Sequence, residues 1–305
     1  MDTCAVDGLC ATACPVDINT GHLIKRLRRE NHSPFSNKVA VMVAKHFSIM
    51  ERFIRFALNS GIAFNYIFGK NAMLKLTSVL HRVIPSFPLW SNAFQRPPSL
   101  KKIVRRTPQS EDNIIYFPTC ISRTMGSYGG KQKNLAETLV SICNKAGIGV
   151  LMLEEAEGSC CGQVFSSKGF NDAYRLMANR IIEQLWSASK QGLLPIVTDI
   201  SSCAYTLSQI RPALDGENKA KFDKLVILDS VDFLHDIVLP RVKTKVRKKS
   251  VVLHPVCSLQ KMKTEGKLIS IARHFAESVV IPVHADCCGM AGDRGFLFPE
   301  LTASA

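Results

Sequence analysis

From residue 113 to the end of the chain, short apolar runs alternate with longer stretches in which apolar and polar positions mix at helical spacing. Strands that alternate with helices predict an open, mostly parallel α/β sheet. Gly147 supports this pattern, because glycine commonly follows the last residue of a helix. The expected strands cover 113–117, 149–153, 195–199, 225–229, 250–254 and 278–283, and the expected helices cover 131–145 and 168–189.

Residues 20–110 follow a different pattern, which is helical and basic. Apolar residues recur at steps of three and four, as on one face of a helix, and basic residues occupy another face. Such a helix either packs on a core with its basic face in water or lies on an anionic membrane surface; packing on the core is favoured. The apolar face comprises Phe47, Met50, Ile54 and Leu58, the basic face comprises Lys45, Arg52 and Arg55, and a proline-rich linker is predicted near 97–108.

An internal repeat divides the rest of the chain. The run IIYFPTC, which ends at Cys120, resembles VVLHPVC, which ends at Cys257. Downstream of each, GSCCGQVFSSKGF resembles ADCCGMAGDRGF. Two signatures in the same order indicate two copies of one α/β unit. We therefore divide the chain into a cysteine-rich segment at 1–19, the helical basic segment and linker at 20–110, a first unit at 111–240 and a second, incomplete unit at 249–305.

The cysteine content predicts metal ligands rather than disulfides. The chain has 11 cysteines, and an odd number argues against a disulfide framework. The start at Met1 shows neither the basic residues nor the apolar run of a signal peptide. We therefore expect a cytoplasmic, reducing compartment, in which clustered cysteines more often bind metals. We expect no transmembrane helix, because no run of 18 uncharged apolar residues is present.

The formal net charge of +14 indicates an anionic partner. Nucleic acid, an anionic membrane surface and an acidic protein all satisfy this requirement. No recognisable nucleic-acid-binding module accompanies the charge, so we expect no nucleic acid partner. A peripheral contact with the inner face of the cell membrane remains an alternative.

The first 15 residues contain a ferredoxin-type cysteine pattern. The spacing C-x2-C-x2-C-x3-C-P places its four ligands at Cys4, Asp7, Cys10 and Cys14, with Pro15 last. The terminal Cys-Pro favours iron–sulfur over zinc. A carboxylate is a harder ligand than a thiolate, so Asp7 ligates weakly, leaves its iron open to water, or marks a three-iron cluster. In a two-cluster ferredoxin the last cysteine binds the other cluster, whose remaining ligands would precede Met1.

A second set of cysteines follows the expected strands. Cys120, the pair Cys160-Cys161 and Cys203 lie in loops that belong to the carboxyl edge of a parallel sheet, where ligands bind. The second unit repeats this set without a counterpart of Cys203. The candidate metal ligands are Cys4, Asp7, Cys10, Cys14, Cys120, Cys160, Cys161, Cys203, Cys257, Cys287 and Cys288.

These motifs resemble the cysteine-rich CCG domain found in heterodisulfide reductases and in the iron–sulfur subunit of glycolate oxidase. The stretches DTCAVDGLCATACPVDINTG and ADCCGMAGDRGFLFPELTASA resemble FAD-linked D-lactate dehydrogenases in particular, and the resemblance covers nearly the whole chain. It implies a helical ferredoxin-like N-terminal segment followed by two tandem Rossmann-like CCG units, the second truncated. It also implies 4Fe-4S clusters, with a non-cubane cluster at the CCG cysteines. Only Cys203 stands where the original motif has a C-x-x-C pair, which leaves the cluster type open.

The resemblance implies electron transfer from flavin, on a missing upstream domain or a partner subunit, to a quinone or cytochrome acceptor. The chain lacks a G-x-G-x-x-G fingerprint after a strand, so alone it is expected to lack dehydrogenase activity. A heterodisulfide reductase acting at the CCG cluster and a zinc-binding interaction protein are the alternatives. Among the other candidates, Cys143 is expected in the core, His254 and His284 are expected to be structural, and Asp199 is expected to hydrogen-bond the loop before Cys203.

Overall fold

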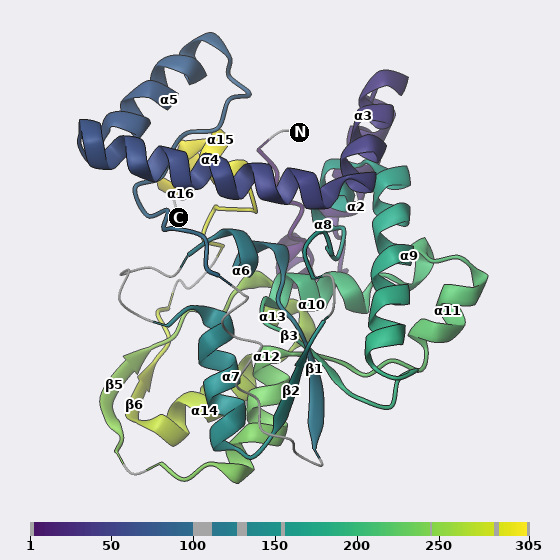
Figure 1. Cartoon of the computed structure of the whole chain (residues 1–305), viewed down its shortest axis with the longest axis vertical. Coiled ribbons are helices and arrows are strands. Elements are labelled where there is room, and N and C mark those ends of the chain that lie inside the picture. Colours follow the sequence, from purple (N-terminus) through teal and green to yellow (C-terminus); the bar gives the residue numbers. More distant parts are fainter. Residues whose placement is uncertain are drawn as a thin grey trace.

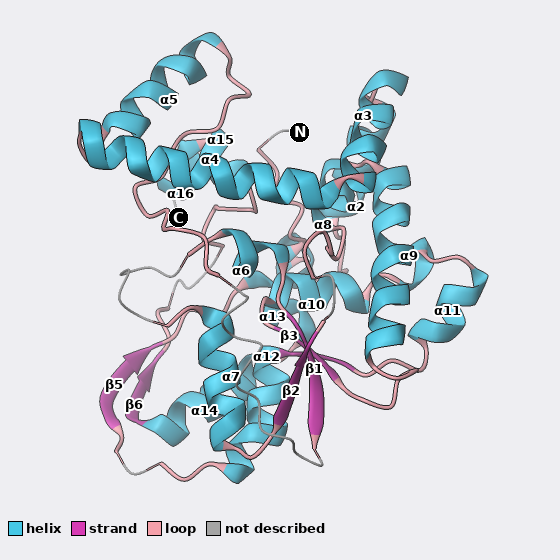
Figure 2. Cartoon of the chain, viewed as in Figure 1, coloured by secondary structure: helices cyan, strands magenta, loops and turns pink. Residues whose placement is uncertain are grey.

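The computed structural model describes residues 3–99, 112–126, 133–153, 156–244, 246–283 and 287–303. They form a mixed α/β fold with two separate parallel sheets (Figure 2). One sheet has the strand order β2-β1-β3-β4, and the other pairs β5 with β6. Every expected strand is present, with ends that differ by a few residues. The strands are β1 (Asn113–Phe117), β2 (Gly149–Met152), β3 (Ile196–Thr198), β4 (Ile227–Asp229), β5 (Lys248–Val252) and β6 (Ala276–Val280).

Helices flank the four-stranded sheet, and α14 (Glu265–Phe275) packs against β6 of the smaller one (Figure 1). Those that precede the first sheet are α1 (Leu9–Ala13), α2 (Thr20–Glu30), α3 (Pro34–Lys45), α4 (Phe47–Phe68) and α5 (Ala72–Val83). Those interleaved with its strands are α6 (Cys120–Thr124), α7 (Leu135–Lys145), α8 (Gln163–Lys168), α9 (Asn171–Ala188), α10 (Ser201–Ser208), η3 (Arg211–Ala213) and α11 (Gly216–Phe222). The remainder are α12 (Ser230–Phe233), η4 (Leu234–Val238), η5 (Leu239–Arg241), α13 (Cys257–Met262), α14 (Glu265–Phe275), α15 (Arg294–Leu297) and α16 (Pro299–Ala303).

The four-stranded sheet is buried on both faces. Its strand β1 is buried from Ile114 to Phe117, as expected for a parallel strand covered by helices on either side. Successive side chains of a strand point to opposite faces, and the core divides accordingly. Ile115 and Phe117 pack in one cluster with residues of α9, whereas Ile114 and Tyr116 pack in another with residues of α7.

Two expected helices have different ends in the structure. The helix expected at 131–145 begins at Leu135, where Asn134 and Glu137 form a reciprocal cap; residues 131 and 132 lie outside the described residues. The helix expected at 168–189 begins only at Asn171, as α9, because Lys168 ends the preceding helix α8 and Gly169, whose φ is +85°, follows it. A Cβ at Gly169 would lie 2.8 Å from the backbone nitrogen of Arg29. The break therefore lets α2 approach closely.

The second sheet is smaller and lies apart from the first (Figure 1). Its strands β5 and β6 each begin two residues earlier than the expected strands, and most of their side chains are exposed or half-buried. Strands β1 to β4 lie between residues 113 and 229, and β5 and β6 lie between residues 248 and 280. The tandem Rossmann-like arrangement itself stays a prediction.

The long helix α4 passes over α6 and the edge of the first sheet (Figure 1). Phe47 and Leu58 are buried, as the predicted apolar face requires, but Ile54 is exposed. Between Phe47 and Leu58, the buried residue of this helix is the acidic Glu51. Within the described residues, no helix is both long enough and apolar enough to cross a membrane. Most of the predicted linker lies outside the described residues.

Candidate metal centres

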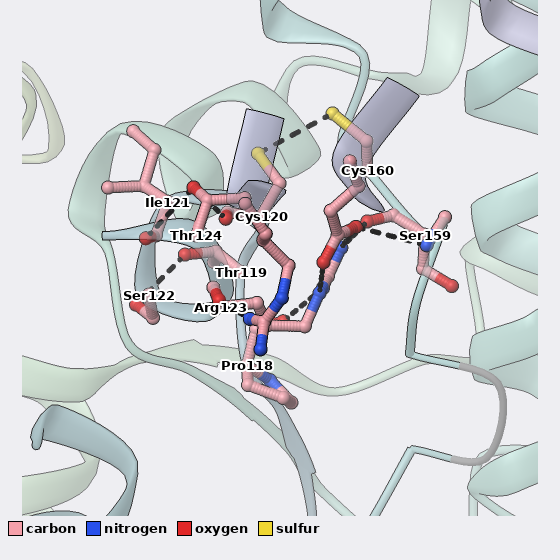
Figure 3. Close-up of polar contacts among 12 residues, drawn as sticks. Pro118, Thr119, Cys120, Ile121, Ser122, Arg123, Thr124, Ser159 and Cys160 are labelled. Atoms are coloured by element: carbon pink, nitrogen blue, oxygen red, sulfur yellow. Dashed lines mark hydrogen bonds and ion pairs between the residues drawn. The ribbon is translucent and has the colours of Figure 1, made fainter. Parts of the chain in front are cut away.

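The cysteines of the first unit converge from three separate connections of the sheet. Cys120 begins α6 directly after β1, the pair Cys160-Cys161 lies between β2 and α8, and Cys203 lies in α10 after β3. The Sγ atoms of Cys120 and Cys160 are 4.0 Å apart (Figure 3). The Cys161 thiol hydrogen-bonds those of Cys160 and Cys203. We call these four residues the first centre.

Burial and thiol contacts shape the chemistry of the first centre. Cys160, Cys161 and Cys203 are 2%, 2% and 3% exposed, so water is excluded from most of the group. A hydrogen bond to Cys160, together with burial, raises the pKa of Cys120 well above its ordinary value. Because the raised pKa favours the protonated thiol, metal binding at this group must release protons. An all-sulfur donor set fits iron–sulfur clusters or zinc.

A glycine turn holds the paired cysteines. Gly162 has a φ of +82°, which favours glycine, and a Cβ there would lie 2.8 Å from the Tyr174 ring. Its N–H donates to the Sγ of Cys160 at 3.4 Å. The turn thus directs a backbone donor at a candidate ligand, in the way that hydrogen bonds to sulfur tune clusters.

A buried ion pair fixes the two loops of the first centre relative to each other. Arg123, three residues after Cys120, donates from Nε and Nη2 to the two carboxylate oxygens of Glu51, each at 2.7 Å. The same guanidinium donates to the carbonyls of Pro118 and Ser159 (Figure 3). Glu51 in turn accepts from the N–H of Gly158 at 3.1 Å. These hydrogen bonds connect helix α4 both to α6 and to the backbone just before Cys160.

Sequence reasoning missed this ion pair. Its two members are 72 residues apart, and Glu51 lies within a helix that otherwise reads as amphipathic and basic. The one available signal was an acidic residue in line with the predicted apolar face. Buried charges require partners, so that position could have suggested an ion pair.

Asp199 connects the loop that precedes α10, the helix of Cys203, to the loop that precedes Cys120. Its carboxylate accepts from the hydroxyl of Tyr116 at 2.6 Å and from the N–H of Thr119 at 3.1 Å. Thr119 immediately precedes Cys120, and Asp199 lies between β3 and α10. Asp199 therefore accepts hydrogen bonds from the strand and loop that precede Cys120, rather than from the expected loop before Cys203. Burial, followed by the charge of Asp199, raises the pKa of Tyr116.

Asp7, Cys257 and Cys287 form a second group of potential ligands. The carboxylate oxygen and the two Sγ atoms all lie within 4.8 Å of one another. Cys257 begins α13 after β5, as Cys120 begins α6 after β1. Burial, then the neighbouring Cys287 and Asp7, raise the pKa of Cys257 to about 12. Cys288 is exposed. We call the three grouped residues the second centre.

The N-terminal cysteines are placed differently. The Sγ of Cys10 is exposed and 3.1 Å from the hydroxyl oxygen of Thr20, a hydrogen bond that lowers the pKa of this thiol. Cys4 accepts from the N–H of Val6, and Cys14 caps the end of α1. Across residues 3–99, the structure does not gather Cys4, Cys10 and Cys14 into one close group of three donors.

The remaining candidates occupy structural or surface positions. Cys143 is fully buried in the core beneath α7, as expected, and burial raises its pKa to about 12. His254 is exposed, and His284 lies outside the described residues. Asp293, directly before α15, pairs with Lys168 at 2.5 Å.

Comparison with known proteins agrees with a cysteine-rich redox domain. Residues 114–208 match the family described as "CCG: Cysteine-rich domain". This range contains all four cysteines of the first centre. The chain is also similar to one subunit of the anaerobic glycerol-3-phosphate dehydrogenase, both from Escherichia coli strain K12 and from Escherichia coli O157:H7. Each is 24% identical over 202 residues, which cover 64% of this chain and 48% of the relative. The chain thus spans about half the length of these relatives. No solved structure matches significantly.

Proposed function

We propose that this chain is the iron–sulfur electron-transfer part of a flavin-dependent dehydrogenase whose substrate is a 2-hydroxy acid, D-lactate. One observation carries the proposal: four cysteine thiols from three separate connections of one parallel sheet meet in a buried group. The cysteine-rich domain match and the similarity to a dehydrogenase subunit support a redox role. The choice of D-lactate rests on the resemblance of the two cysteine-rich ends of the chain.

In this proposal the four cysteines of the first centre bind the cluster, and neighbouring residues orient them. Cys120, Cys160, Cys161 and Cys203 hold an iron–sulfur cluster, which supplies one-electron transfer when bound. Arg123 and Asp199 orient the loops that carry these thiols through hydrogen bonds to backbone groups. The surrounding core excludes water, and burial is one of the factors that set a cluster's potential. Electrons enter from FAD on a partner subunit or domain and leave to a quinone or cytochrome.

Anaerobic reconstitution of the full chain with iron and sulfide tests the proposal. We expect bound iron and acid-labile sulfide in the wild type, and at least ~10-fold weaker iron binding at the first centre in Cys161→Ala, because a ligand is lost. Cys143→Ala is the matched control, since this buried cysteine lies in the core beneath α7; it should keep the iron. The wild-type chain should not reduce a dye with D-lactate unless the flavin partner is added. A colourless chain with stoichiometric zinc would contradict the proposal.

The exposed side of α4 supports a contact between this chain and an anionic membrane surface. Phe53 and Phe56 are 64% and 69% exposed, beside the exposed cation Arg52, on a chain of net charge +14. Inserting such side chains into the lipid interface is favourable, and basic residues add attraction to anionic lipids. We expect binding to vesicles that contain anionic lipid, weakened at least ~10-fold in the double variant Phe53→Ser/Phe56→Ser. Sedimentation with vesicles measures this, and equal binding of the variant would count against the contact.

A further inference from the structure

We propose that Asp7 is a ligand of the second centre, where its carboxylate completes an iron site with Cys257 and Cys287. This inference rests on the proposed iron–sulfur function. The spacing of the N-terminal cysteines predicts that Asp7 is a ligand of the ferredoxin-type cluster. Here Asp7 is assigned instead to a centre in the second unit. The N-terminal segment would then supply a ligand to that centre in addition to containing three cysteines of its own.

The first support is the distance between the donor atoms. The carboxylate oxygen of Asp7 and the Sγ atoms of Cys257 and Cys287 lie within 4.8 Å of one another. Ligands that stand about 2.0–2.3 Å from one tetrahedral ion are ~3.5–3.8 Å apart. The three donors, at most 4.8 Å apart, exceed this spacing by only about 1 Å, so one metal centre fits among them.

The second support is that α13 holds the Asp7 backbone while it presents Cys257. Lys261, one turn beyond Cys257, donates from Nζ to the carbonyl oxygen of Asp7 at 2.7 Å. The same ammonium lies 4.2 Å from the centroid of the Tyr205 ring, in α10. Asp7 is thus attached to the helix that begins with one of its two cysteine partners.

A glycine beside Asp7 allows the N-terminal loop to pass close to Lys261. Gly8 has a φ of +75°, and a Cβ at that position would lie 2.7 Å from both Nδ2 of Asn19 and Nζ of Lys261. The N–H of Leu9 donates to Oδ1 of Asp7 at 3.2 Å, which orients the carboxylate. Only glycine allows the chain to turn here without pushing Lys261 away.

The chemistry of the donor set gives this centre a distinct property. The first centre has four thiols, whereas the described residues gather two thiols and one carboxylate at the second. A carboxylate is a harder donor than a thiolate and suits iron of a cluster less well. The iron bound by Asp7 is therefore expected to exchange more readily than iron bound by cysteines alone.

Residue-resolved alkylation of the full chain, reconstituted anaerobically with iron and sulfide, tests the assignment. Iodoacetamide labels free thiols, and mass spectrometry reports each cysteine separately. In the wild type, Cys257 and Cys287 should be protected relative to the chelator-treated chain. In Asp7→Asn their labelling should rise about tenfold, as expected for lost ligation, while Cys160 and Cys161 stay protected. Continued protection of the first centre shows that the variant is folded.

Two further variants sharpen the test. Asp17→Asn changes an exposed carboxylate of the same segment and should leave all protection unchanged. Asp7→Cys should restore the protection of Cys257 and Cys287 and slow the exchange of radioactive iron.

The assignment is overturned if Asp7→Asn leaves Cys257 and Cys287 protected, or if it exposes Cys4 and Cys10 instead. Protection of Cys257 and Cys287 by zinc in a chain that takes up no iron would also overturn it. Failure of the proposed function gives a different result, because the cysteines of the first centre would then be unprotected in the wild type as well.

Discussion

The two centres differ in how their ligands are brought together. The thiols of the first centre follow neighbouring strands of one parallel sheet, so the fold of that sheet places them at a common edge. The donors of the second centre come from opposite ends of the chain, and a hydrogen bond from Lys261 fixes one of them. Sheet topology thus builds the first centre, whereas docking of a distant loop builds the second. We expect the first to be more rigid and the second to be easier to open.

The largest expected effect comes from breaking the ion pair beside the first centre. Arg123 and Glu51 are 0% and 2% exposed, and removing one partner of a buried pair leaves the other charge without compensation. We expect Arg123→Met to lower the free energy of unfolding by about 3–5 kcal/mol. Urea denaturation of the full chain measures it.

The control for this variant is a half-exposed cluster of one lysine and two aspartates, in which water screens the charges. Lys267 is 35% exposed and contacts Asp232 and Asp236, so Lys267→Met should cost less than ~1 kcal/mol. The double variant Arg123→Met/Glu51→Leu should recover part of the loss, because no buried charge then remains unpaired. Equal costs for the Arg123 and Lys267 variants would refute the role assigned to the buried pair.

Arg123→Met should also separate the two centres chemically. Arg123 contacts the carbonyl of Ser159, directly before Cys160 (Figure 3). Its other hydrogen bonds run to Glu51 and Pro118, neither of which belongs to the second centre. In a variant that remains folded, alkylation of Cys160 and Cys161 should therefore rise while that of Cys257 does not.

The contrast between the centres also explains which features could be predicted from the sequence. The strands and the positions of Cys120 and Cys203 follow from local patterns, because an apolar run specifies a buried strand and the cysteines follow it directly. Asp199 was found because it also ends a strand. Glu51 with Arg123, and Asp7 with Cys257, were not found, because their contacts arise from packing between segments distant in sequence. A single sequence does not identify the partner in such a pair; at most, as with Glu51 in the apolar face of α4, it indicates that a partner is needed.

The smallest expected effects come from the glycine that follows each cysteine pair, and they test whether the two turns are equivalent. Gly162 and Gly289 have φ values of +82° and +68°, so alanine at either position should cost about 1–2 kcal/mol through backbone strain alone. A Cβ at Gly162 would meet the Tyr174 ring, whereas one at Gly289 would lie 2.1 Å from the carbonyl oxygen of Leu301. Backbone yields less readily than a side chain, so Gly289→Ala should distort its own turn more.

Each alanine variant should act on its own centre. We expect Gly162→Ala to raise alkylation of Cys161 without changing Cys287, and Gly289→Ala to do the reverse. Gly266→Ala is the matched control: Gly266 lies in α14 with open space around it and without a positive φ, so the exchange should be neutral or stabilising by up to ~1 kcal/mol. If either turn variant exposed the cysteines of both centres equally, the two centres would open as one cooperative unit. The difference between a centre built by the sheet and one built by docking would then have no energetic consequence.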